Sequence, residues 1–95
     1  MHLLFINFEY YISQVGDSMV EKLKIKAIYD DFVKNVTLTE EQLKILDMLL
    51  KRDSIVKISM EIGASQRTIS YEIRKLKDLF NKYYEVQIYK TMMLL

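Results

Sequence analysis

The apolar residues of this chain recur at spacings of three and four over most of its length, the pattern of amphipathic helices. In the N-terminal third of the chain, Ser18 and Glu21 form a capping box, so a helix is expected from Ser18 to about Asn35. Asp30, Asp31 and the lysines are expected to face away from the core. The expected inward stripe of this helix consists of Ile25, Ile28, Tyr29, Phe32, Val33 and Val36.

A second helix start is clearer. Thr39 and Gln42 form a capping box, and Leu38 and Leu43 occupy the two positions of a hydrophobic staple. The pattern predicts a helix over residues 40–51. The apolar residues available to face the core, in some combination, are Leu43, Leu46, Met48, Leu49 and Leu50.

Two further helices follow, separated by a glycine. Ser54 is the expected N-cap of a short helix that ends at Gly63, which suits a left-handed residue after a helix. Ser65 is the expected N-cap of the next helix, and the absence of a breaker lets that helix continue through Tyr84. The expected inward residues of the two helices are Ile55, Ile58 and Ile62, then Ile69, Ile73, Leu76 and Phe80.

The two ends are apolar and ambiguous. Residues 1–14 alternate with period two, which favours a strand, although a helix also fits. Residues 85–95 fit a helix or a strand. Both ends are rich in aromatic residues or Met, and they either complete the core or form a dimer interface.

Composition supports a mainly all-α single domain. The chain has 95 residues, 51% hydrophobic and 28% charged, with no Pro and two Gly. We divide it into an N-terminal packing or dimerisation segment (1–37), a helix-turn-helix core of three helices (38–84) and a C-terminal packing segment (85–95).

The absence of Cys excludes disulfides and thiolate metal sites and fits a cytoplasmic protein. No segment reaches the roughly 20 apolar residues of a membrane span.

The two helices joined at Gly63 have the form of a helix-turn-helix, whose second helix enters the major groove of DNA. Residues 51–82 hold eight basic and four acidic residues, whereas residues 1–50 hold five and eight, so positive charge gathers on this unit. The residues expected to face bases are Gln66, Arg67, Ser70, Tyr71 and Arg74. Those expected at phosphates are Lys57, Ser65, Thr68, Lys75 and Lys77.

The run from Ile62 to Ile69, together with the Leu38–Thr39 opening, resembles the DNA-binding domains of LuxR/GerE regulators and the fourth region of sigma factors. The resemblance covers under half of the chain and implies a sequence-specific transcriptional regulator. Ser59 stands where these families usually have a small Ala. No receiver, ligand-binding or other sigma region precedes the motif, and small phage and mobile-element regulators are similar to this chain in size.

Other functions have weaker support in the sequence. His2 is the only histidine, Asp30 and Asp31 are expected to face solvent, and the serines suit helix caps, so neither an enzyme nor a bound cofactor or metal is expected. The expected partners are double-stranded DNA, a second copy of the chain and RNA polymerase, with no membrane. The alternative is a protein-interaction module that binds RNA polymerase or another regulator without binding DNA.

Overall fold

The computed structural model describes residues 18–94, and all regular structure in this range is helical. A short helical segment over residues 18–23 is followed by α2 (Lys26–Asn35), α3 (Glu40–Leu50), α4 (Ile55–Ile62) and α5 (Gln66–Met93). The expectation of a mainly all-α chain is therefore confirmed. The strand favoured for residues 1–14 lies outside the described residues.

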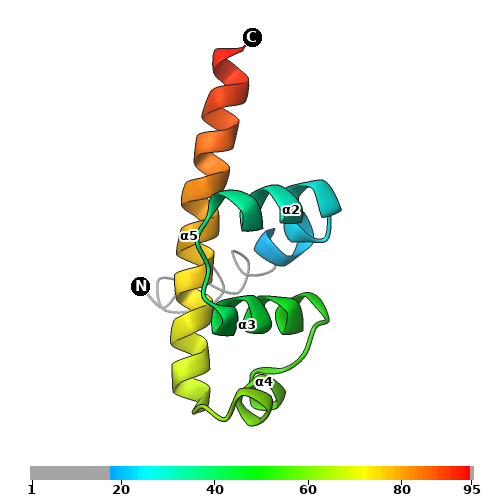
Figure 1. The fold of residues 1–95 in the computed structure, drawn as a ribbon, viewed down its shortest axis with the longest axis vertical. Helices are drawn as coiled ribbons and strands as arrows, with labels where there is room; N and C mark the ends of the chain where they lie inside the picture. The colour runs from blue at the N-terminus through cyan, green and yellow to red at the C-terminus, as the bar shows by residue number, and fades with distance from the viewer. Residues whose placement is uncertain (1–17, 95) are drawn as a thin grey trace, which may run out of the picture.

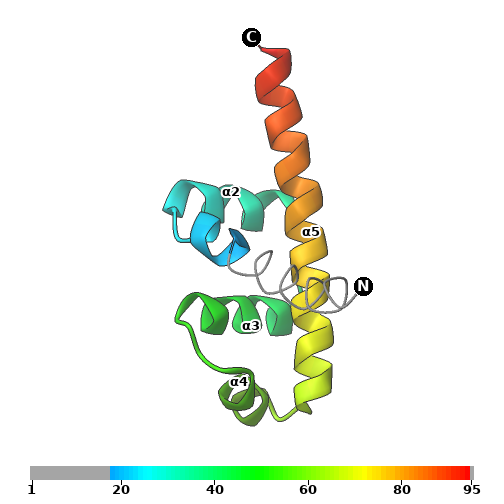
Figure 2. The ribbon, with the colours of Figure 1, turned by 180° about the vertical axis from the view of Figure 1, so that it is seen from behind.

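The long helix α5 is the axis of the molecule. Figure 1 shows α2, α3 and α4 stacked along one side of α5, with α4 beside its N-terminal end. The reverse view in Figure 2 shows the same order and shows that the C-terminal part of α5 extends past α2. Within residues 18–94, each helix is too short or too polar to cross a membrane.

Side-chain caps fix where α3, α4 and α5 begin. Thr39 accepts a hydrogen bond from the Gln42 backbone N–H at 3.0 Å, and the Gln42 side chain accepts one from the Thr39 N–H, also at 3.0 Å. Ser54 and Ser65 cap α4 and α5, each accepting an N–H three residues along the chain at 3.1 Å. Each satisfied cap stabilises its helix by about 1 kcal/mol, and all three predicted starts are confirmed.

The core lies between α5 and the helices stacked on it. Phe32 of α2 meets Phe80 of α5 edge to face at a centroid distance of 5.3 Å, and Tyr83 at 5.2 Å. The four apolar residues predicted to face inward on α5 are all buried, and α5 continues through Tyr84 as expected. It runs on to Met93, which settles as helix most of a segment that the sequence left open between helix and strand. The buried apolar residues are Met19, Leu23, Phe32, Ile45, Leu46, Met48, Ile58, Ile69, Ile73, Leu76, Phe80 and Tyr83.

The single helix predicted from Ser18 to Asn35 is wrong, because the chain breaks at Lys24 and Ile25. Ile25 is extended (φ −78°, ψ 114°) and starts α2 without a side-chain cap. Leu23 and Phe32 explain the break. They are nine residues apart, which is about 180° around a continuous helix, yet both are fully buried in one core. Only a bend between them allows both side chains to point inward.

The burial of several side chains differs from the sequence-based expectation. Ile25, predicted to face inward, is 55% exposed, and Ile55, the first residue of α4, is 39% exposed. Ile45 is fully buried although it was absent from the residues expected to face the core. Leu43, Leu49 and Leu50 are half-buried. Spacing within one helix is therefore not sufficient to predict which of these side chains are buried.

Two tyrosine–aspartate hydrogen bonds connect α2 with its neighbours. The Tyr29 hydroxyl donates to Asp47 of α3 at 2.9 Å, and the Tyr83 hydroxyl of α5 donates to Asp31. Asp31, expected to face solvent, is instead half-buried and accepts this hydrogen bond. Burial, the hydrogen bond to Asp31 and the negative charge of that carboxylate raise the pKa of Tyr83 to about 12.

This raised pKa predicts a loss of stability at alkaline pH. Protonated Tyr83 is favoured in the folded state, so its contribution is complete below pH about 10 and is lost as the pH rises through about 12. Urea unfolding between pH 8 and 12 measures the slope. The Tyr83→Phe variant serves as the comparison, and its stability should fall less steeply over this window. Equal slopes for the two proteins would contradict the assignment.

Candidate nucleic-acid interface

The turn between α4 and α5 adopts the geometry that the sequence predicted. Gly63 ends α4 in the left-handed region at φ 77° and ψ 31°. Its N–H donates to the Ser59 carbonyl at 2.8 Å, and the Ala64 N–H donates to the same carbonyl at 3.1 Å. The chain then enters α5 at the Ser65 cap. Gly63 thus turns the backbone from one helix to the next within three residues.

Replacing Gly63 with Ala is expected to destabilise the fold through its backbone alone. A Cβ at this position would meet no heavy atom within 4 Å, so no clash adds to the cost of the positive φ. The expected cost is a loss of about 1–2 kcal/mol in the free energy of unfolding. The midpoint of urea unfolding measures this loss. Gly63→Asn is the matched control and should lose less, because Asn tolerates the left-handed region better. Equal losses in the two variants would show that φ is not the cause.

Buried isoleucines fix the orientation of α5 against the rest of the fold. Ile58 of α4 and Ile69 of α5 are fully buried, and Ile73 is 8% exposed. Ser59 is also buried, and its hydroxyl donates to the Val56 carbonyl at 2.8 Å within the same helix. The hydroxyl therefore needs no partner from α5, and Ser59 occupies the packed position as a small residue without an unsatisfied polar group.

The opposite face of the first half of α5 is open. Arg67, Tyr71 and Arg74 follow one another at spacings of four and three, so they form a single outward stripe. All three are exposed, and Tyr71 is 57% exposed. Among residues 18–94, neither arginine side chain has a hydrogen-bond or ion-pair partner. Gln66 and Ser70 are also exposed and flank the stripe.

Some of the predicted lysines already have partners. Lys75 lies 3.4 Å from the Glu72 carboxylate and 4.6 Å from the centroid of the Tyr71 ring. Lys57 pairs with Asp53 at 3.2 Å, one turn earlier. Both lysines are largely exposed, so these pairs are weak and can exchange for another anion. Lys77 differs, because it is half-buried and its interactions within the protein are already made.

The first turn of α5 combines a cap with free backbone donors. The Ser65 hydroxyl accepts the Thr68 N–H and also donates to the Thr68 hydroxyl at 2.9 Å. Both side chains are therefore occupied with each other. The first N–H groups of a helix have no acceptor within that helix, so those of Gln66 and Arg67 are the donors that this end of α5 offers to an anion.

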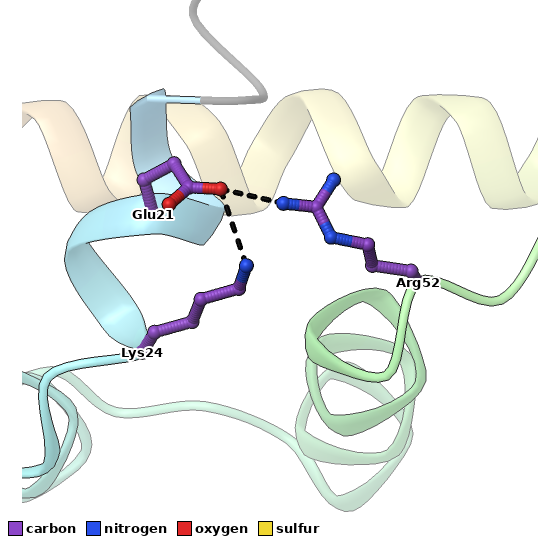
Figure 3. Close-up of polar contacts among 3 residues, drawn as sticks. All are labelled: Glu21, Lys24 and Arg52. Atoms are coloured by element: carbon purple, nitrogen blue, oxygen red, sulfur yellow. Dashed lines mark hydrogen bonds and ion pairs between the residues drawn. The ribbon is translucent and has the colours of Figure 1, made fainter.

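One basic residue in the turn before α4 escaped the sequence reasoning. Arg52, in the turn between α3 and α4, has a left-handed backbone (φ 63°), which is unusual for a residue with a side chain. Its guanidinium lies 2.5 Å from a Glu21 carboxylate oxygen, and the Lys24 ammonium reaches the same oxygen at 3.2 Å (Figure 3). No local sequence signal predicts this contact, because it joins residues 31 positions apart.

This cluster ties the segment 18–23 to the turn that leads into α4. The hydrogen bond from Lys24 and the nearby positive charges lower the pKa of Glu21. Glu21 was expected to form a capping box with Ser18, but Ser18 is itself helical and accepts a hydrogen bond from Lys22 at 2.9 Å. The carboxylate therefore serves a tertiary contact rather than a cap.

The described residues thus gather most of the predicted contacts on one end of the molecule, around the start of α5. Lys57 belongs to α4, and the other nine belong to α5 or its cap. Lys77 alone is half-buried, while the remaining nine are exposed. Comparisons of the chain with protein-family models, with curated proteins and with solved structures found no significant match.

Proposed function

We propose that the chain binds double-stranded DNA sequence-specifically and regulates transcription, with the first half of α5 in the major groove. One observation carries the proposal. Arg67, Tyr71 and Arg74 form an exposed stripe on a helix whose opposite face is buried at Ile69 and Ile73. A helix held on one side and open on the other is what reading base edges requires.

The chemistry of the stripe suits base recognition. A guanidinium grips guanine through O6 and N7, and the two arginines have no partner among the described residues to compete for it. Gln66 can pair with adenine, while Tyr71 and Ser70 reach phosphate or a thymine methyl. The exposed Lys57 and Lys75 would exchange their carboxylate partners Asp53 and Glu72 for phosphates, which fixes the register of the protein on the duplex.

The proposal extends to the setting of this activity. The resemblance to LuxR/GerE domains and to the fourth region of sigma factors supports a cytoplasmic regulator that works beside RNA polymerase. A homodimer would present two such stripes to a palindromic site. The outward stripe is bounded by Asp78, which is exposed about one turn beyond Arg74, so each copy covers a short stretch of DNA.

Binding to a pool of random duplexes, with the bound fraction sequenced at two salt concentrations, tests the proposal. The expected result is an enriched motif whose affinity falls steeply with salt, because each phosphate contact releases counterions. A palindrome would indicate a dimer and give the half-site spacing, and a single half-site would indicate a monomeric reader. The absence of any enrichment, with affinity indifferent to salt, would overturn DNA recognition.

A protein-interaction module is the second candidate. The observation that favours it is the exposed apolar surface of α4, where Met60 is 78% and Val56 is 50% exposed. RNA polymerase or another regulator would cover these side chains together with Tyr71. This candidate predicts that binding to RNA polymerase survives Arg67→Ala and is lost in Met60→Asp. The DNA-binding proposal predicts the reverse order for duplex DNA.

A further inference from the structure

The C-terminal part of α5 is a helix without a covering layer. It extends past α2 in both views of the ribbon (Figures 1 and 2). Most of its apolar side chains are open, in contrast to the first half of the helix, where apolar residues face the core. The exposed apolar residues are Val86, Ile88, Tyr89, Met92, Met93 and Leu94. An exposed patch of this kind usually meets a partner.

One stripe on this segment has the spacing of a coiled coil. Leu79, Val86 and Met93 are seven residues apart, and Lys82 and Tyr89 lie between them at the second position of the same repeat. Leu79 is half-buried, whereas Val86, Tyr89 and Met93 are 50%, 65% and 70% exposed. The stripe therefore starts beside the folded body and continues along the open end of α5.

The N-terminal part of this stripe, from Leu79 to Val86, lines a groove. A hollow of about 410 Å³ lies between the end of α2 and α5, and Val36 forms its wall on the α2 side. Leu79, Lys82 and Val86 line the α5 side. A helix seated along the stripe would fill this hollow and would gain contact with Val36 as well as with α5.

The C-terminal part of α5 has a second apolar side, which is partly covered by the folded body. Tyr84, Ile88 and Met92 line a smaller hollow of about 250 Å³. Tyr84 is stacked on Phe80 and lies under the Lys22 ammonium at 4.3 Å from the ring centroid. That side is therefore partly covered by the segment 18–23, whereas the stripe of Leu79, Val86 and Met93 is covered by no described residue beyond the edge at Val36.

We propose that two copies of the chain pair through this stripe as a parallel, in-register two-stranded coiled coil over residues 79–93. Charge decides the direction. Glu85 and Lys90 flank the stripe on opposite sides and are five residues apart. In a parallel pair Glu85 of one copy faces Lys90 of the other, twice by symmetry. In an antiparallel pair each flank faces the same flank of the other copy, so Glu85 and Lys90 no longer meet.

The residues in the seam agree with two strands. A β-branched residue such as Val86 at the first core position favours a dimer over larger bundles. Lys82 is a polar residue at a second core position of the seam, which lowers stability, but its aliphatic stem can pack while the ammonium reaches water. This pairing does not rest on DNA binding, because none of its residues belongs to the outward stripe of Arg67, Tyr71 and Arg74.

Disulfide cross-linking tests the pairing directly, because the chain has no cysteine of its own. Val86→Cys and Met93→Cys, each made alone in the full chain, are expected to form cross-linked dimers under mild oxidation. Thr91→Cys, an exposed position pointing away from the seam, is the control and should remain largely monomeric on a non-reducing gel. No DNA is present, so this result and the DNA-binding result are separate.

Each outcome decides the proposal. An antiparallel pair allows self-linking at one layer at most, so cross-links at only one of positions 86 and 93 would overturn the parallel register. Equal cross-linking at Thr91→Cys would show random collision and would also overturn it. The same holds if the wild-type protein sediments as a monomer at all concentrations measured.

A charge exchange supplies a second, independent readout. Glu85→Lys and Lys90→Glu each turn two attractive pairs into repulsive ones and are expected to raise the dimer Kd about tenfold. The double variant Glu85→Lys/Lys90→Glu restores the attraction and should return the Kd close to that of the wild type, measured by sedimentation equilibrium. A double variant as weak as the single ones would overturn the pairing of these two residues.

Discussion

Phe80→Ala is expected to lower the free energy of unfolding by about 3–5 kcal/mol. Phe80 is 1% exposed, and its ring centroid lies 5.3 Å from that of Phe32 and 5.6 Å from that of Tyr84. Its removal would leave a cavity where α2 packs on α5. A domain of this size has a total stability of about 5–15 kcal/mol, so the variant should lose a large part of it.

Urea unfolding followed by circular dichroism measures this loss. Met60→Ala, at a position 78% exposed, is the control for the loss of a large apolar side chain outside the core and should change stability by no more than about 0.5 kcal/mol. Phe80→Leu should fall between the two. A loss below about 1 kcal/mol for Phe80→Ala would mean that the α2–α5 contact does not hold the fold together.

Arg67→Ala or Arg74→Ala is expected to reduce discrimination between the preferred and a random duplex by about 1–3 kcal/mol, if DNA is bound as proposed. Each removes a guanidinium that no described residue engages, so folding stability should change little. Competition binding with both duplexes at one fixed salt concentration gives the discrimination directly. Unfolding curves of the same variants show whether the fold is intact.

Lys57→Ala provides the contrast. Lys57 belongs to α4 and pairs with Asp53, so its proposed role is a phosphate contact that carries no sequence information. Its loss should weaken binding to every duplex alike and reduce the salt slope by about 1. Altered sequence preference in Lys57→Ala, with unchanged preference in Arg67→Ala, would show that α5 does not lie in the groove as proposed.

Local rules predicted the starts of α3, α4 and α5, because a Ser or Thr cap acts on N–H groups within three residues of itself. The Gly63 turn was predictable for the same reason, since a positive φ is a property of one residue. The exposed positions on the first half of α5 followed from helical periodicity once Ile69 and Ile73 were assigned to the core. Each of these features depends on residues that are close in sequence.

The features that were missed depend on residues far apart in sequence. The break at Lys24 and Ile25 carries no Gly or Pro, and it exists because Leu23 and Phe32 must enter the same core. The contact of Arg52 with Glu21 joins a turn and a helical segment that come together only in the fold. The DNA contacts themselves stay predictions, because their test is a binding measurement.

The continuity of α5 fixes the rotational phase between its two ends. The helix runs for 28 residues without Gly or Pro, a rod about 42 Å long. Inserting one residue near Asn81 would therefore turn the end that carries Val86 by about 100° relative to Arg67, and inserting seven would nearly restore the original angle. The angle between a partner bound at the C-terminal end of α5 and the outward arginines is therefore set by the number of residues between them.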